Sequence, residues 1–190
     1  MLVAQAAFGQ AQTVVTFPDT NLEAVIRSVI SKPTGDILDT DLLSVTYLVS
    51  RNNTFSDLTG MEYCTNLTVL EFQNDQITSI GPLQYLTSLS SLNLSNNSIS
   101  DITALVNNEG LGSGDTVDLT GNPLSAQAYA DIAMLQTRGV TVTYDPQPTT
   151  GTLTVVLYPA AVTDSAEWRV VNGDGYWYFS GESLNLSPGT

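Results

Sequence analysis

The chain has 190 residues, of which 42% are hydrophobic and only 13% are charged. Its net charge of −14 leaves no basic footprint for phosphate groups, which argues against nucleic acids and anionic membrane surfaces as partners. Histidine is absent and there is one cysteine, so imidazole catalysis, an intrachain disulfide and a multi-cysteine metal site are excluded. We therefore expect no cofactor, and no stretch is apolar for long enough to be inserted in a membrane as a helix.

Residues 1–15 are apolar and rich in small side chains. The triplets Ala4–Ala6 and Gly9–Ala11 both resemble a signal-peptidase site, although no basic segment precedes them and the apolar run is short. We interpret this segment as the remnant of a signal peptide. A frayed terminus is the alternative.

Residues 16–44 are predicted to form a helical cap. Asp19 or Thr20 can cap a helix, and apolar residues then follow at helical spacing, namely Leu22, Val25, Ile26, Val29 and Ile30. The segment "DTDLLSV", which starts at Asp39, predicts a second, short helical turn that leads into the first strand.

Residues 45–124 repeat with a period of 22, as "LTVLEFQNDQITSI" from Leu67 and "LSSLNLSNNSISDI" from Leu89 show. The same register extends back to Val45 and, with three extra residues in a glycine-rich turn, forward to Leu124. The consensus L-x-x-L-x-L-x-x-N-x-I is typical of leucine-rich repeats, in which leucines point inward from a short strand and the asparagine satisfies backbone groups of the turn. Because one coil cannot bury its apolar side alone, coils stack. The sequence thus predicts an α/β leucine-rich-repeat solenoid of about four coils with a short parallel sheet.

Residues 125–145 are predicted to be a C-terminal cap. Ser125 can cap a helix, Gly139 can end it, and the alternation of "VTVTY" from Val140 indicates a final strand.

Over about residues 16–145 the chain resembles internalin-like bacterial leucine-rich-repeat proteins. The resemblance rests on the cap "FPDTNLEAVIRSVISKPTGDI", the junction "LTGMEYCTNLTVL", the two 22-residue copies and the exit "GDTVDLTGNPLS". It implies a secreted or surface-displayed protein whose repeats bind other proteins. It supplies no catalytic residues.

After a Pro/Thr/Gly linker at residues 146–152, the apolar period changes to two over residues 153–190. This part resembles a small β-sandwich repeat of multidomain bacterial surface proteins, whose last strand would follow Thr190. We therefore expect an incomplete antiparallel β domain and a chain that is a fragment of a longer protein. Its aromatic residues suit either alternating strand positions or a carbohydrate platform, and they are Trp168, Tyr176, Trp177 and Tyr178.

Three groups of residues could suggest a metal or catalytic site, and in each case the sequence argues against it. The cluster of Asp36, Asp39 and Asp41 lacks the spacing of a calcium loop, and helix capping explains it better. The pair Asp115 and Asp118 lies on an open strand side with no obvious pocket. Cys64 takes a leucine position of the repeat, which predicts a buried small hydrophobe. We expect a non-enzymatic protein.

The candidate binding residues are outward positions of the repeat strands, which line the concave face. They are Tyr47, Val49, Arg51, Val69, Glu71, Gln73, Asn93 and Asp118. Tyrosine and arginine dominate binding hot spots, so we expect a protein ligand, of unknown identity, to bind around Tyr47 and Arg51. The alternatives are a structural spacer that presents another domain of a longer parent, and carbohydrate binding through the C-terminal aromatic residues.

Overall fold

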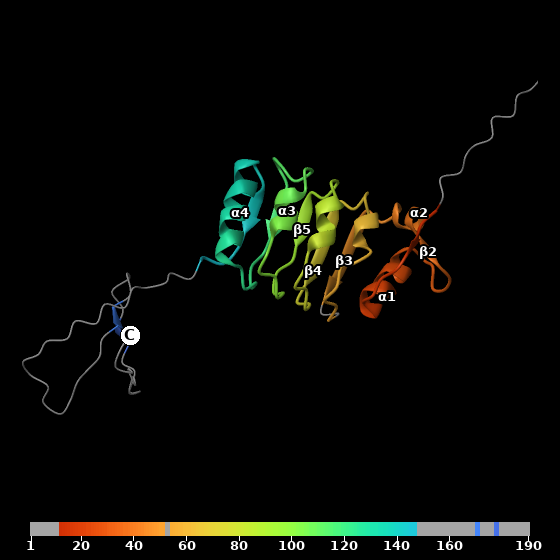
Figure 1. Cartoon of the computed structure of the whole chain (residues 1–190), viewed down its shortest axis with the longest axis horizontal. Coiled ribbons are helices and arrows are strands. Elements are labelled where there is room, and N and C mark those ends of the chain that lie inside the picture. Colours follow the sequence, from red (N-terminus) through yellow and green to blue (C-terminus); the bar gives the residue numbers. More distant parts are fainter. Residues whose placement is uncertain (1–11, 52–53, 148–169, 172–176, 179–190) are drawn as a thin grey trace, which may run out of the picture. The chain divides into compact units, whose positions relative to one another are not determined.

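The computed structural model describes residues 12–51, 54–147, 170–171 and 177–178. The chain divides into two units, Met1–Gln147 and Pro148–Thr190. The first unit carries the cap and the repeats, and Figure 1 shows its elements following one another from α1 to α4 in sequence order. Within the part of the chain that is described, no helix is both long enough and apolar enough to span a bilayer.

The N-terminal cap consists of β1 (Val14–Val15), α1 (Thr20–Val29), β2 (Ile37–Leu38) and α2 (Asp39–Leu42). Asp19 is the residue that caps α1, because its Oδ1 accepts hydrogen bonds from the N–H groups of Asn21 and Leu22 at 3.0 and 3.2 Å. Leu22 and Ile26 of α1 are fully buried in the core and Val25 packs against it in part, whereas Val29 at the end of the helix is 45% exposed.

The folded part begins earlier than the predicted boundary at residue 16. Val14 and Val15, which the sequence assigned to the leader remnant, pair antiparallel with Leu38 and Ile37 of β2. The side chain of Val15 is 5% exposed, which makes this strand part of the core. The correction has a physical reason: a two-residue strand has too few positions to show an alternating pattern.

The repeats form one parallel sheet of five strands in sequence order: β3 (Tyr47–Arg51), β4 (Val69–Gln73), β5 (Ser91–Asn93), β6 (Thr116–Asp118) and β7 (Thr141–Thr143). Each strand contributes one inward-facing apolar residue to a buried row that crosses the sheet. The row consists of Leu48, Leu70, Leu92, Val117 and Val142. The leucine-rich-repeat solenoid is therefore confirmed. Strand β7, which comes from the predicted C-terminal cap, extends the same sheet.

The return path of each coil carries a short helix: the 3-10 helices η1 (Met61–Tyr63) and η2 (Gly81–Tyr85), then α3 (Thr103–Asn107) and finally α4 (Ala126–Thr137). We call the side that carries η1, η2 and α3 the convex face. Between it and the sheet, buried side chains of the cap and all coils form one continuous core. Phe55 and Phe72 of successive coils meet there edge to face, with their ring centroids 4.6 Å apart.

The repeat asparagines hold the turns as the period predicts. The Asn97 amide donates to the carbonyls of Phe72 and Leu94 at 2.8 and 3.0 Å, and its Oδ1 accepts from the N–H of Ile77. Asn122 repeats this arrangement one coil later. Each side chain thus joins two neighbouring coils.

In the second unit, β8 (Val170–Val171) and β9 (Trp177–Tyr178) pair antiparallel. The rest of the expected antiparallel β domain lies outside the described residues, as do Trp168 and Tyr176. The carbohydrate platform and the incomplete β domain therefore stay predictions.

Candidate functional site on the concave face

The strand register brings all eight candidate residues onto one face of one sheet. Tyr47 and Val69 share a row with Ser91, Thr116 and Thr141. The next row contains Val49, Glu71, Asn93, Asp118 and Thr143, and Arg51 lies beside Gln73 beyond it. This juxtaposition follows from parallel strands in register, where side chains of equivalent positions line up across the sheet.

The β3–β4 end of this face is its most chemically distinctive part. Tyr47 is 58% exposed and stands beside the half-buried side chains of Val49 and Val69. Arg51 Nη2 contacts Glu71 Oε2 at 2.7 Å. We call the set Tyr47, Val49, Arg51, Val69 and Glu71 the N-terminal corner. It combines an aromatic ring, aliphatic surface and an oriented guanidinium group.

Two candidate residues are engaged in their own turns. Asn93 Oδ1 accepts from the N–H and hydroxyl of Ser95 at 3.0 and 2.8 Å. Asp118 Oδ1 accepts the same pair of bonds from Thr120, at 3.0 and 2.8 Å. These side chains therefore fix the ends of β5 and β6, and the atoms that make those bonds are occupied.

The face becomes more acidic toward β7. Asp115 accepts from the N–H of Gly112 at 2.8 Å, and Asp145 accepts from the N–H of Gly121 at 2.6 Å. Asp115, Asp118 and Asp145 thus give the β7 end three carboxylates. The N-terminal corner, in contrast, carries the guanidinium group of Arg51 beside Glu71. This corner thus carries an ion pair of opposite charges, whereas the β7 end is negatively charged.

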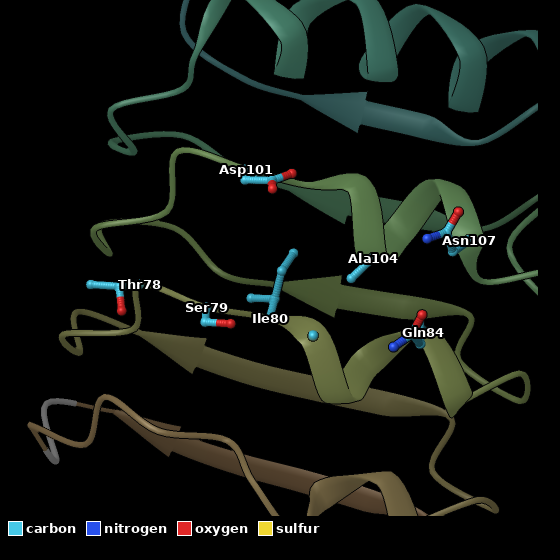
Figure 2. Close-up of a pocket in the computed structure, with 8 residues that line it drawn as sticks. Thr78, Ser79, Ile80, Gln84, Asp101, Ala104 and Asn107 are labelled. Atoms are coloured by element: carbon cyan, nitrogen blue, oxygen red, sulfur yellow. The ribbon is translucent and has the colours of Figure 1, made fainter.

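The convex face carries a hollow that sequence reasoning missed. It lies between η2 and α3, has a volume of about 420 Å³, and is lined by residues 78–81, 84, 101, 104 and 107. Figure 2 shows Gln84 and Asn107 on one side of it, and Thr78, Ser79 and Asp101 on the other. A signal was present in the sequence: Gly81 breaks the pattern of Thr59 and Thr103 at the equivalent positions.

Cys64 has the environment of a core residue. Its side chain is fully buried, and burial, followed by the negative charge of Glu62, raises the pKa of the thiol to about 12. Such a thiol is protonated at neutral pH and is a poor nucleophile. Among the described residues, no three His, Cys, Asp or Glu side chains gather closely enough to hold a metal ion.

The comparisons with known proteins agree with this architecture. Residues 65–107 match the family model described as leucine-rich repeats (2 copies). A parallel sheet built from such coils defines a leucine-rich-repeat protein. The chain has no significant match among curated proteins.

Solved structures show which leucine-rich-repeat proteins the chain is similar to. The chain is 32% identical to an internalin (inlF) from Listeria monocytogenes, with a TM-score of 0.59 over 67% of this chain and 36% of that one. It is therefore an internalin-like leucine-rich-repeat protein, and it spans little more than a third of the length of that internalin.

Two further structures are similar over parts of the chain. Internalin C2 (inlC2) of Listeria monocytogenes is 22% identical, with a TM-score of 0.48 and 74% of both chains covered. A structure of CBM51-2, in complex with GlcNAc, and INT domains from Clostridium perfringens ZmpB is 32% identical, with a TM-score of 0.43 over 48% of this chain and 20% of that one. The internalin-like assignment rests on inlF and on the repeat family model.

Proposed function

We propose that this chain is a non-enzymatic protein-interaction or adhesion module of a secreted or surface-exposed bacterial protein, and that its ligand binds the N-terminal corner. The observation that carries the proposal is the exposure of Tyr47 beside Val49 and Val69 on a rigid sheet. The likeness to an internalin supports the class of function and the location outside the cell.

The physical case for the corner is one of contact area and preorganisation. A tyrosine on a sheet buries a large amphipathic surface while losing few rotamers, so its contact with a partner costs little entropy. Glu71 contacts the Arg51 guanidinium at 2.7 Å, which orients this group on the face before a partner arrives. The other coils offer only small residues in the Tyr47 row, namely Ser91, Thr116 and Thr141.

Size requires the interface to extend beyond the corner. Five strands spaced by about 4.8 Å and exposing about 10–13 Å each give a face of a few hundred Å². A specific interface needs about 800 Å² from each partner. Leu43 is 45% exposed four residues before Tyr47, and its carbonyl accepts a bond from Asn66 at the start of the next coil. We infer that the partner also covers Leu43.

Site-specific photo-crosslinking tests the placement. A benzophenone side chain at Val69 is expected to capture a protein from a displayed library of extracellular proteins. The matched probe at Met134, which is 48% exposed on α4, is expected to capture none of it. Capture with equal yield at both positions would contradict the proposed surface.

Affinity measurements with the captured ligand then test the two anchor residues. Tyr47→Ala and Arg51→Ala are each expected to raise the dissociation constant at least about tenfold, because truncating a hot-spot side chain costs about 2 kcal/mol or more. The control is Met134→Ala, which should leave the affinity unchanged. Unaltered binding by both corner variants would refute the corner as the binding site.

A further inference from the structure

The convex hollow lies where the middle coil departs from its neighbours. In the flanking coils Thr59 and Thr103 occupy the position of Gly81, and their hydroxyls donate to the aspartate two residues earlier at 2.6 and 2.7 Å. The middle coil has Ser79 and Gly81 instead of that pair. Ser79 and Gly81 both line the hollow of about 420 Å³.

Folding does not require glycine at this position. A Cβ at Gly81 would meet only the Ser79 hydroxyl, at 3.8 Å, which is an ordinary contact, and Gly81 does not have a positive φ. Gly110 is different, because a Cβ there would collide with the backbone of Thr87. The glycine at position 81 therefore has no steric explanation within the described residues, and keeping the hollow open is its visible consequence.

The lining has polar ends and an apolar middle. Figure 2 places the amides of Gln84 and Asn107 at one end, hydroxyl groups and Asp101 at the other, and Ile80 and Ala104 between them. Amides and hydroxyls both donate and accept hydrogen bonds. No lysine or arginine lines the hollow. Its volume falls in the range of about 300–1,000 Å³ that is usual for small-ligand sites.

We propose that this hollow binds one neutral sugar residue of a glycan. A pyranose ring presents C–H groups that fit the Ala104 and Gly81 floor, and its peripheral hydroxyls reach the polar groups at both ends. The site is separate from the N-terminal corner, so it does not depend on the proposed protein interaction.

The negative charge of Asp101 favours neutral sugars over anionic ones. Hydrogen bonds from Thr103, its hydroxyl first and its N–H second, hold the pKa of Asp101 below its usual range, so the carboxylate stays ionised at neutral pH. Anionic sugars are therefore repelled. A lysine or arginine side chain from a peptide would gain little binding free energy from an ion pair with Asp101. The carboxylate is exposed, and one of its oxygens already accepts from Thr103.

Nuclear magnetic resonance titrations of the full ¹⁵N-labelled chain test the proposal. The probes are methyl glucoside, methyl galactoside and N-acetylglucosamine up to about 50 mM, since an open site binds a single sugar weakly. We expect saturable shifts of the Gly81, Ala104 and Asn107 amides with at least one probe. N-acetylneuraminic acid, which is anionic, should shift them less.

Two variants decide whether the hollow is responsible. Gly81→Thr restores the residue of the flanking coils and projects a branched side chain into the hollow, and Gln84→Ala removes one amide. Both are expected to keep the fold, checked by their melting transitions, and to weaken sugar binding at least tenfold. Met134→Ala, at an exposed position of α4 that does not line the hollow, is the control that should bind sugars normally.

Three outcomes would overturn the proposal. The first is the absence of a saturable shift with every neutral sugar. The second is undiminished sugar binding by Gly81→Thr. The third is a set of shifts produced by N-acetylarginine amide but by no sugar, which would identify a peptide site. A failure of the corner variants in the protein-binding assay would leave this result unaffected.

Discussion

At the scale of single residues, Asn97 links two neighbouring coils of the solenoid. Its buried amide donates to the Leu94 carbonyl of its own turn and to the Phe72 carbonyl of the preceding coil, and it accepts from the N–H of Ile77 there, so two of the three bonds join the coils. In Asn97→Ala the Phe72 carbonyl and the Ile77 N–H lose this partner, whereas the Leu94 carbonyl keeps its bond from Asn122 at 2.9 Å. We expect a loss of about 2–4 kcal/mol in the free energy of unfolding, since each buried unsatisfied group costs about 1–3 kcal/mol.

Urea denaturation measures this loss, with the denaturant slope checked for constancy. Asn66→Ala is the matched control, because that amide makes one exposed bond, at 2.8 Å to the Leu43 carbonyl, and should cost less than about 1 kcal/mol. Equal losses for the two variants would contradict the role given to Asn97.

The residue scale also shows how far sequence reasoning reaches. The 22-residue period predicted the turn roles of Asn97 and Asn122, because equivalent positions of a solenoid have equivalent surroundings. The same period placed Asn93 and Asp118 on the exposed face but could not show that their oxygens are occupied by Ser95 and Thr120. A period gives the direction of a side chain, whereas its hydrogen-bond partner depends on the geometry of one turn.

At the scale of elements, the contact of α1 with the first coil depends on Asp19. One carboxylate oxygen caps α1, and the other accepts from the N–H of Ser56 at 2.8 Å. Partial burial tends to raise the pKa of Asp19, but hydrogen bonds from Ser56, Leu22, Asn21 and Asp57 together outweigh it and lower the pKa below the ordinary value of 3.8. The sequence predicted the cap but not the link to Ser56, which lies 37 residues away.

The sign of the pH dependence follows from that shift. A carboxylate with a lowered pKa in the folded state stabilises the fold above the unfolded value and loses this contribution as the pH falls through the folded value. Asp19→Ala should therefore lower the free energy of unfolding by about 1–2 kcal/mol at pH 7. The difference from wild type should shrink as the pH falls below about 4.

Urea denaturation curves of wild type and Asp19→Ala, recorded at pH 7 and at pH 3, test this expectation. Asp36→Ala, at an exposed position before β2, is the control and should be nearly neutral throughout. A deficit of Asp19→Ala that stays constant down to pH 3 would show that the ionised carboxylate has no such role.

At the scale of the whole molecule, the cap and the coils share one core that runs from Val15 to Val142. Each coil of a solenoid contacts only its neighbours, so its cooperativity depends on these interfaces. The sequence predicted the stacked coils because their apolar period is long and regular. It did not predict that Val14 and Val15 pair with β2, since two residues carry no periodic signal.

Cys64 offers a direct measurement of that cooperativity. It is fully buried in the first coil, and burial, with the charge of Glu62 second, raises the pKa of its thiol to about 12. We expect a thiol reagent at pH 8 to label the native protein only through unfolding. In the fast-exchange regime, the free energy from the labelling rate should then equal the value from urea denaturation.

The reference for labelling is Thr65→Cys in a Cys64→Ala background, which exposes a thiol one residue further along the same coil. If Cys64 reacts much faster than global unfolding allows, the first coil opens separately from the rest. Because Tyr47 and Arg51 belong to that coil, their strand would then lack the rigidity on which low-entropy binding at the N-terminal corner depends. Slow labelling would instead mean that the corner is held by the stability of the entire solenoid.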